Sequence, residues 1–191
     1  MKIAIIDLES RLSDSVFAAV ERTGVDYDVF QYDVKPDELH DYDGIVLTGS
    51  HDTVFDGGRL IDRKILEMSK PVLGICYGHQ LVHYLYGGEV VRSETPEVDV
   101  SVLFKQEKSE LFKGLPDTHM VYMYHYDEVV RMAEGFVKMG ETDNSFYAAS
   151  QNTDKKIYTI QFHPEADGND FGDEIYKNFI DIVCKDKNNT I

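Results

Sequence analysis

The sequence predicts an α/β protein with a doubly wound, mostly parallel sheet flanked by helices and carrying an antiparallel extension. In the first half of the chain, short apolar runs typical of buried strands alternate with segments of helical periodicity. This alternation is typical of a parallel sheet covered by helices on both faces. From about residue 89 to residue 160, short strand-like segments dominate, which indicates mixed or antiparallel pairing in the second half.

Hydrophobic periodicity places the individual elements along the chain. Four apolar segments predict strands of the parallel part: residues 2–7, 25–30, 44–47 and 71–75. Four segments with helical periodicity or helix-ending glycines predict helices: residues 10–23, 60–68, 78–86 and 172–183. Three further strands are predicted in the second half: residues 98–104, 118–123 and 156–160. We therefore expect one domain over residues 1–184, followed by a polar, frayed tail over residues 185–191.

The charge and hydropathy of the chain argue against several function classes. The sequence holds 35 acidic and 19 basic residues, a formal net charge of −16, and such a negative field repels the phosphate backbone of nucleic acids. The same charge suits either a basic protein partner or a well-solvated surface. The apolar runs are too short to cross a membrane, and the first residues show no secretion signal. We therefore expect a cytoplasmic protein without a nucleic-acid or membrane partner.

The segment Pro71–Gln80 predicts a nucleophile at a sharp turn between a buried strand and a helix. It reads Pro-Val-Leu-Gly-Ile-Cys-Tyr-Gly-His-Gln. The small residues Gly74 and Gly78 leave room for the cramped backbone that lifts the Cys76 side chain clear of the sheet. The helix after the cysteine points its positive end at the sulfur, which favours the thiolate. The amide of Tyr77 would then face the oxyanion formed when the thiolate adds to a carbonyl. A buried structural cysteine at a strand end is the alternative.

A second segment, Tyr158–Glu165, predicts a general base and the group that orients it. Pro164 biases His163 toward extended geometry, and residues two apart in an extended chain face the same way. The histidine can then serve the thiol with one ring nitrogen while Glu165 holds the other. A solvent-facing loop at the end of a strand is the alternative, and it is weakened by the cysteine turn in the same chain.

Together, the two segments resemble the paired signature of class I glutamine amidotransferases. The resemblance rests on Gly74–Gln80 and Gln161–Glu165 and extends over residues 2–183. It implies that family's doubly wound fold and a catalytic triad of Cys76, His163 and Glu165. In such a triad the cysteine forms a γ-glutamyl thioester with the side chain of glutamine. The histidine protonates the departing ammonia and then activates water. A synthetase partner consumes the ammonia, and neither a cofactor nor a metal is implied.

Within the family, several segments look most like the separate amidotransferase subunit of GMP synthetases, which serve the conversion of XMP to GMP together with an ATP-pyrophosphatase partner. Residues 49–56 are similar to its Gly-Gly-Pro loop, and residues 124–129 to its Ser-His-x-Asp-Glu-Val motif. The resemblance implies an oxyanion hole made by Tyr77, Gly49 and Ser50. It also implies a glutamine-binding pocket made by Gln80, Tyr124, His125 and Tyr126.

Three residues depart from the pattern of those relatives. Ser50 and His51 replace a glycine and a proline of the loop, and Tyr124 replaces the serine before His125. If the loop needs a positive φ, a non-glycine residue is strained there and one oxyanion donor is weakened, at a cost of about 3 kcal/mol. The alternative is that Ser50 keeps the amide in place by a different local geometry. The tyrosine alters the pocket for the α-amino and carboxylate groups of the substrate. These departures leave the triad intact but weaken the assignment to GMP synthesis itself.

The remaining candidate groups carry weaker signals. His79 and His83 lie four positions apart on a predicted helix, a spacing that can bind metal. Because the sequence offers no third ligand, we expect a packed pair. His125 and Asp127 are expected to shape a substrate pocket or a partner surface rather than to react. Cys184 lies on the apolar face of the last predicted helix and is interpreted as a core residue.

Two alternatives to an ammonia-delivering glutaminase stay open. The first is a non-catalytic binding or regulatory module that keeps the fold, and the departures at Ser50, His51 and Tyr124 favour it. The second is a stand-alone γ-glutamyl hydrolase that acts on a small peptide or conjugate and needs no partner. For the glutaminase, we expect low activity of the isolated chain until a synthetase docks.

Overall fold

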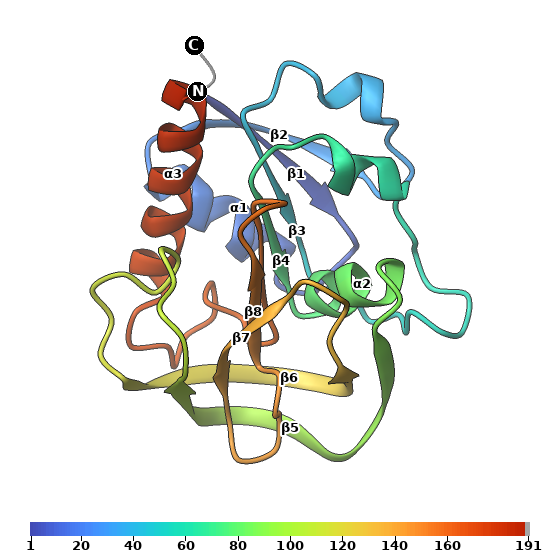
Figure 1. Cartoon of the computed structure of the whole chain (residues 1–191), viewed down its shortest axis with the longest axis vertical. Coiled ribbons are helices and arrows are strands. Elements are labelled where there is room, and N and C mark those ends of the chain that lie inside the picture. The colour runs from blue at the N-terminus through green and yellow to red at the C-terminus, as the bar shows by residue number, and fades with distance from the viewer. Residues whose placement is uncertain (190–191) are drawn as a thin grey trace.

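The computed structural model describes residues 1–189 and builds them around a nine-stranded mixed sheet (Figure 1). The strand order is β2-β1-β3-β4-β9-β8-β7-β5-β6. The strands are β1 Lys2–Asp7, β2 Asp26–Gln31, β3 Gly44–Leu47, β4 Val72–Ile75, β5 Glu89–Lys105, β6 Thr118–Arg131, β7 Val137–Glu141, β8 Ala149–Asn152 and β9 Ile157–Ile160. The helices are α1 Ser13–Arg22, α2 Tyr77–Leu85 and α3 Gly172–Asn189, with short 3-10 helices η1 Pro36–Leu39 and η2 Arg63–Glu67.

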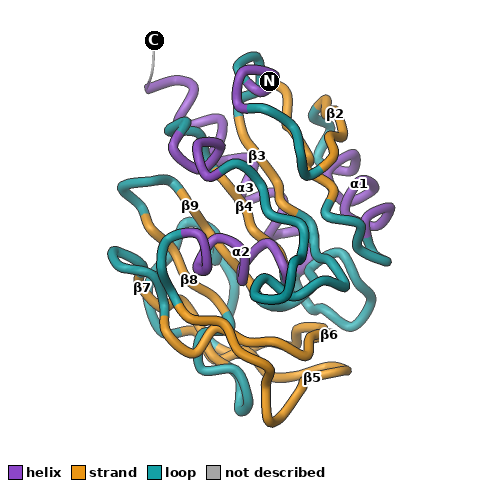
Figure 2. Tube along the Cα trace, turned by 90° about the vertical axis from the view of Figure 1, so that its right-hand side faces the viewer, coloured by secondary structure: helices purple, strands orange, loops and turns teal. Residues whose placement is uncertain are grey.

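The parallel part of the sheet is doubly wound. β1 pairs with β2 and β3, β3 with β4, and β4 with β9, all in parallel. β3, β4 and β9 are buried along their whole length, so their apolar side chains meet packed layers on both faces. α1 and α3 pack on one face through Val16 and Phe179, whereas α2, η1 and η2 pack on the other through Leu81, Leu39 and Ile65 (Figures 1 and 2). The predicted fold class is therefore confirmed.

The antiparallel extension continues from β9 through β8, β7, β5 and β6. β5 and β6 form a long two-stranded ribbon that lies across the lower end of the molecule in Figure 1. The register between the two strands shifts between Arg92 and Glu97. Such a break bends a ribbon and re-aims its side chains. Here the side chain of Glu97 is buried, although the neighbouring residues on both sides are exposed.

The predicted elements agree with the observed ones best in the parallel part. All four strands predicted there are confirmed to within one residue at each end. β5 and β6 extend well beyond the predicted segments 98–104 and 118–123, because their polar halves carry no apolar run that marks a strand. The helix predicted over residues 60–68 is wrong, since only the 3-10 helix η2 forms there. Asp62 begins it by accepting a hydrogen bond from the amide of Lys64, and Pro71 follows too soon for a longer helix.

The last helix is longer than predicted. α3 continues through Asn189, so the frayed tail expected from residue 185 is helical as far as the described residues reach. Lys185 pairs with Glu110, and Nζ of Lys187 lies 3.1 Å from Asp43, which ties this part of the helix to two loops. The remainder of the predicted tail, residues 190–191, lies outside the described residues. Across the described part of the chain, no helix combines the length and apolar character needed to cross a membrane.

Candidate active site

Cys76 lies at a strained turn between β4 and α2. Its φ of 52° and ψ of −105° place a non-glycine residue in a sparsely populated backbone region. Flanking glycines make the turn possible. A Cβ on Gly74 would lie 2.8 Å from the carbonyl oxygen of Gly78, and a Cβ on Gly78 would lie 2.8 Å from that of Leu47. The strand, turn and helix predicted around the cysteine are therefore observed.

The thiol of Cys76 is almost buried, with 4% of the residue exposed. Its Sγ lies 3.6 Å from the backbone oxygen of Tyr124 and 3.6 Å from Nε2 of Gln161. The amide of Cys76 donates to the carbonyl of Ile160 at 2.8 Å, which ties the turn to the neighbouring strand β9. The cysteine directly precedes α2, so the unpaired amides of the first helical turn, beginning with Tyr77, favour a negative charge there.

His163 follows β9 and bonds to Glu165, as the sequence predicts. His163 Nδ1 lies 2.7 Å from Glu165 Oε1, and the glutamate side chain is inaccessible to solvent. The hydroxyl of Tyr176 on α3 donates to the other carboxylate oxygen at 3.4 Å. Burial and the charge of Glu165 raise the pKa of Tyr176 well above its usual value, so this hydroxyl stays a donor.

The second ring nitrogen of His163 is left free on the cysteine side. Nε2 is buried and has no hydrogen-bond partner among the described residues. A Cβ on Gly49 would lie 3.1 Å from Cε1 of His163 and 3.6 Å from Cβ of Cys76, so the three residues meet at one point. Burial alone would lower the pKa of His163, but the neighbouring Cys76 and Glu165 raise it well above its usual value. The protonated form of the His163 ring is thus favoured.

The loop after β3 brings Gly49 and Ser50 beside the cysteine. Neither Ser50 nor His51 has a positive φ. The strain that a positive φ would impose on a non-glycine residue is therefore absent, and the loop adopts a different local geometry. Ser50 Oγ instead accepts a hydrogen bond from the amide of Asp52 at 3.2 Å, a local turn that needs no glycine. Gly49 has to remain a glycine, since a side chain there would press against the ring of His163.

A cavity of about 430 Å³ lies next to the thiol. Its lining includes Cys76 and all four residues predicted to bind glutamine, namely Gln80, Tyr124, His125 and Tyr126. It also includes Arg11 and Arg92, which were not among the predicted site residues. Arg11 follows the carboxyl end of β1, and ligands bind at the carboxyl ends of the strands in sheets of this kind. Its position in the sequence could therefore have indicated a role in binding. Arg92 offered no such signal, because only the β5–β6 pairing brings it to the site.

Gln80 is held in one orientation within the wall of this cavity. Its Nε2 donates to the backbone oxygen of Asp127 at 2.8 Å and to Oε1 of Gln161 at 3.1 Å. Both amide hydrogens are thereby used, and the side-chain oxygen is the group left for a ligand. Asp127 also pairs with Arg92, with 3.1 Å between Oδ1 and Nη1. Burial raises the pKa of the Asp127 carboxyl despite this nearby positive charge.

His79 and His83 lie on the buried side of α2 and do not line the cavity. His79 Nδ1 bonds to the hydroxyl of Thr159 and His83 Nε2 to that of Ser150, each at 2.8 Å. Burial lowers the pKa of both rings, that of His83 to about 3, so they pack as neutral side chains. In the part of the chain that the structure describes, no group of three or more His, Cys, Asp or Glu residues could hold a metal ion.

Comparisons with known proteins identify the family. The family model for class-I glutamine amidotransferases matches residues 4–183. The chain is 38% identical over 191 residues to the glutamine-hydrolyzing GMP synthase of Lactococcus lactis subsp. cremoris MG1363 and 36% identical over 190 residues to that of Aquifex aeolicus. Each match covers 98% of this chain but 37% of the relative. A crystal structure described as that of a GMP synthase subunit from Thermoplasma acidophilum matches with a TM-score of 0.90 and 25% identity. That match covers 100% of this chain and 97% of the other.

This chain therefore belongs to the class-I glutamine amidotransferase family. It spans little more than a third of the length of the curated GMP synthases that it matches, and nearly the whole of the Thermoplasma chain. Both curated relatives named above are GMP synthases, and the chain resembles them in sequence over 98% of its length.

Proposed function

We propose that this chain hydrolyses the side-chain amide of glutamine and delivers the ammonia to a synthetase. The observation that carries the proposal is the approach of the His163–Glu165 pair to Cys76, whose side chain lines the cavity. The cysteine is held in a strained turn, and the histidine bonds to a buried carboxylate while its other nitrogen is free on the thiol side. Membership of the amidotransferase family supports glutamine as the substrate.

The catalytic steps follow from the position of each group. The Cys76 thiolate attacks the side-chain carbonyl carbon of glutamine, and the amides of Tyr77 and Ser50 donate to the oxyanion. His163 gives its Nε2 proton to the departing nitrogen, so ammonia leaves and a γ-glutamyl thioester remains on Sγ. Water then gives a proton to Nε2 and attacks the thioester, which releases glutamate and restores the thiolate. Glu165 keeps the imidazole in the productive orientation and stabilises its positive charge.

The cavity suits a free amino acid, which carries both charges at neutral pH. Arg11 and Arg92 supply positive charge for an α-carboxylate, whereas Asp52 and the oxygen of Gln80 can accept hydrogen bonds from an α-ammonium group. A volume of about 430 Å³ lies within the range of small-molecule sites. We therefore assign this cavity to the backbone end of glutamine and the Cys76 end to its amide.

The acceptor of the ammonia is proposed from the relatives. Because the matched relatives are GMP synthases, the acceptor reaction is the amination of XMP to GMP, carried out by an ATP-pyrophosphatase synthetase partner. The match covers only about a third of those proteins. The proposal therefore assigns the glutamine half-reaction alone to the residues described here, and we expect it to be slow until the synthetase is bound.

Covalent labelling tests the glutaminase half of the proposal. Purified protein is treated with a glutamine-analogue electrophile, with and without a candidate synthetase, and examined by intact mass and peptide mapping. We expect one adduct on Cys76 that excess glutamine blocks and that His163→Ala slows strongly. Cys184→Ser is the matched control, and its Cys76 should be labelled as in the parent protein. The Cys184 thiol lies on α3, where it donates a hydrogen bond to the sulfur of Met1. No adduct under either condition would favour the non-catalytic binding module.

The synthetase half is tested separately. Glutamine-dependent formation of GMP from XMP and ATP should appear only when this chain is mixed with the synthetase. Full glutaminase activity of the chain alone, unchanged by the synthetase, would contradict this part of the proposal and favour a stand-alone γ-glutamyl hydrolase.

A further inference from the structure

A second histidine–glutamate pair joins β5 and β6, with Glu97 on the first strand and His125, which lines the cavity, on the second. Nε2 of His125 lies 3.2 Å from Oε2 of Glu97, and the two side chains are 1% and 3% exposed. The pair forms where the β5–β6 register shifts after Arg92. Neither the proposed triad nor the predicted glutamine pocket includes Glu97, which makes its burial a feature that the reaction chemistry leaves unexplained.

Glu97 is surrounded by hydroxyl groups that donate to it. Ser101 and Thr142 each donate to Oε1 at 2.9 Å, and Ser145 donates to Oε2 at 2.6 Å. Burial alone would raise the pKa of Glu97, but the hydrogen bonds from His125 and these hydroxyls lower it. An ionised carboxylate with this many donors is a fixed acceptor, and it can hold the neighbouring imidazole in one orientation.

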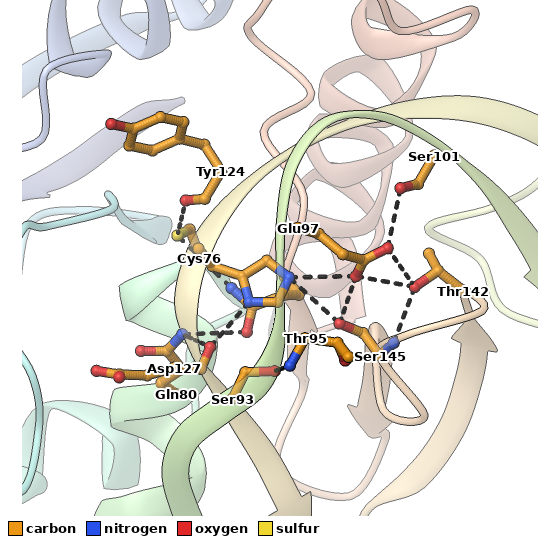
Figure 3. Close-up of polar contacts among 12 residues, drawn as sticks. Cys76, Gln80, Ser93, Thr95, Glu97, Ser101, Tyr124, Asp127, Thr142 and Ser145 are labelled. Carbon is orange, nitrogen blue, oxygen red and sulfur yellow. Dashed lines mark hydrogen bonds and ion pairs between the residues drawn. The ribbon is translucent and has the colours of Figure 1, made fainter.

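The opposite nitrogen of His125 faces the active site. Nδ1 lies 2.9 Å from the backbone oxygen of Asp127. The same oxygen accepts the side-chain nitrogen of Gln80 at 2.8 Å. These hydrogen bonds form one connected set, which leads from Gln80 and Asp127 through the imidazole of His125 to Glu97. Figure 3 shows the two ends of this set, Gln80 beside Asp127 and Glu97 beside Thr142 and Ser145. The orientation of Gln80 in the cavity wall is thus linked to a carboxylate buried behind it.

We propose that Glu97 is a positioning residue for glutamine binding, which acts through His125 and the Asp127 carbonyl on Gln80. The inference rests on the proposed function, since it assumes that glutamine occupies the cavity. Glu97 holds the His125 imidazole in one orientation, and the imidazole holds the Asp127 carbonyl in place. The carbonyl accepts from the Gln80 amide nitrogen and so determines the direction in which the Gln80 side-chain oxygen points. No described hydrogen bond joins Glu97 to Cys76, His163 or Glu165. Its loss therefore weakens the binding of glutamine and leaves the reactivity of the thiol unchanged.

Inactivation kinetics separate these two effects without a synthetase. In a Cys184→Ser background, saturation with a glutamine-analogue electrophile gives a binding constant KI and a maximal rate kinact. Iodoacetamide reports the reactivity of the Cys76 thiol without using the glutamine pocket. For Glu97→Gln we expect KI to rise about tenfold, because a buried hydrogen-bonding set loses one member. The values of kinact and the iodoacetamide rate should stay within about twofold of the parent protein.

Three further variants sharpen the test. In a Gln80→Ala background, Glu97→Gln should raise KI no further, because the proposed route passes through Gln80. Thr142→Val removes one hydroxyl donor and should raise KI in the same direction by a smaller factor, which keeps the proposal testable if Glu97→Gln does not fold. Ser150→Ala is the matched control, since it removes a fully buried hydroxyl that bonds to His83. Its KI should be unchanged.

The outcomes are distinct. An unchanged KI in folded Glu97→Gln or Thr142→Val overturns the positioning role, and so does a further rise of KI in the Gln80→Ala background. If the parent protein shows no saturable inactivation while iodoacetamide still alkylates Cys76, the proposed glutamine substrate itself fails, and the positioning role falls with it.

Discussion

Two histidines of this molecule bond to buried glutamates, and they differ in what their second ring nitrogen does. In the pair His163–Glu165, Nδ1 contacts the carboxylate and Nε2 has no partner among the described residues. In the pair His125–Glu97, both nitrogens are occupied, one by the carboxylate and one by the Asp127 carbonyl. A ring with a free nitrogen can transfer a proton, whereas a ring bonded at both ends can only hold its neighbours in place.

The two pairs also arise differently from the chain. His163 and Glu165 lie two residues apart, so the local extended geometry after β9 is sufficient to join them. Glu97 and His125 lie 28 residues apart and meet only through the antiparallel pairing of β5 and β6 and the register shift within it. The first pair is therefore set by local sequence, and the second by tertiary structure.

The largest expected effect on activity comes from replacing His163 and His125, one at a time, by asparagine. His163→Asn should lower kcat by about 10³, because a general acid–base group is lost. His125→Asn keeps a side-chain donor near the Asp127 carbonyl and should act mainly on KM for glutamine. Steady-state glutaminase assays with the synthetase present measure both constants. Equal losses of kcat in the two variants would show that the pairs do not differ in the way we propose.

Glu165→Gln tests whether the first pair needs a charge. We expect kcat to fall by roughly 10²–10⁴, because an amide no longer stabilises the imidazolium. Tyr176→Phe removes only the 3.4 Å hydrogen bond to the other carboxylate oxygen and serves as the milder companion variant. A Glu165→Gln enzyme with nearly full kcat would assign the orienting role to another group.

Glu165→Gln should also change how the free energy of unfolding depends on pH. The pKa of His163 is raised in the folded protein, so the resulting stabilisation is fully present below the unfolded value of about 6.5. It is lost as the pH rises through the raised pKa. The free energy of unfolding of the parent protein should therefore exceed that of Glu165→Gln most clearly near pH 6, and the difference should shrink toward pH 10. Denaturant titrations across this range would contradict the raised pKa if the difference stayed constant or grew.

Gly49→Ala should affect the His163–Glu165 pair and leave the His125–Glu97 pair unchanged. The new Cβ would lie 3.1 Å from the ring of His163, so the imidazole must shift by a few tenths of an ångström. We expect kcat to fall about tenfold, since small displacements of catalytic groups are costly. KM should change little. A selective rise in KM would instead place Gly49 on the binding side of the site.

The smallest effect on activity is expected for a substitution of Ser50. Ser50→Gly restores the glycine that the resembled GMP synthetases have at this position, yet Ser50 shows no positive φ for a glycine to relieve. Activity should stay within about twofold, and the free energy of unfolding should fall slightly because glycine makes the unfolded loop more flexible. A large gain in kcat would show that the serine does impair the oxyanion hole.

Much of the parallel half could be predicted from the sequence, because each of its strands is a compact apolar run. The nucleophile turn and the pair His163–Glu165 could be predicted for a related reason, since each is a contiguous motif. The lengths of β5 and β6 could not, because exposed ribbon residues carry no clear apolar pattern. Glu97 and Arg92 reach their positions only through that ribbon, so no local signal marked either residue. For the Ser50 loop the sequence left two alternatives, strain at a positive φ or a different local geometry, because the backbone angles depend on the turn that the whole loop forms.

The strand order has a further consequence for how such a protein can change. Cys76 follows β4 and His163 follows β9, and these strands are direct neighbours joined by the Cys76 amide and the Ile160 carbonyl. The polypeptide between them runs through α2 and the strands β5 to β8 of the same sheet before it enters β9. The spacing of nucleophile and base is therefore insulated from insertions or deletions in residues 89–152, because lengthening such an excursion costs only slowly increasing closure entropy. The antiparallel half of the sheet can thus change in length while Cys76 and His163 keep their separation.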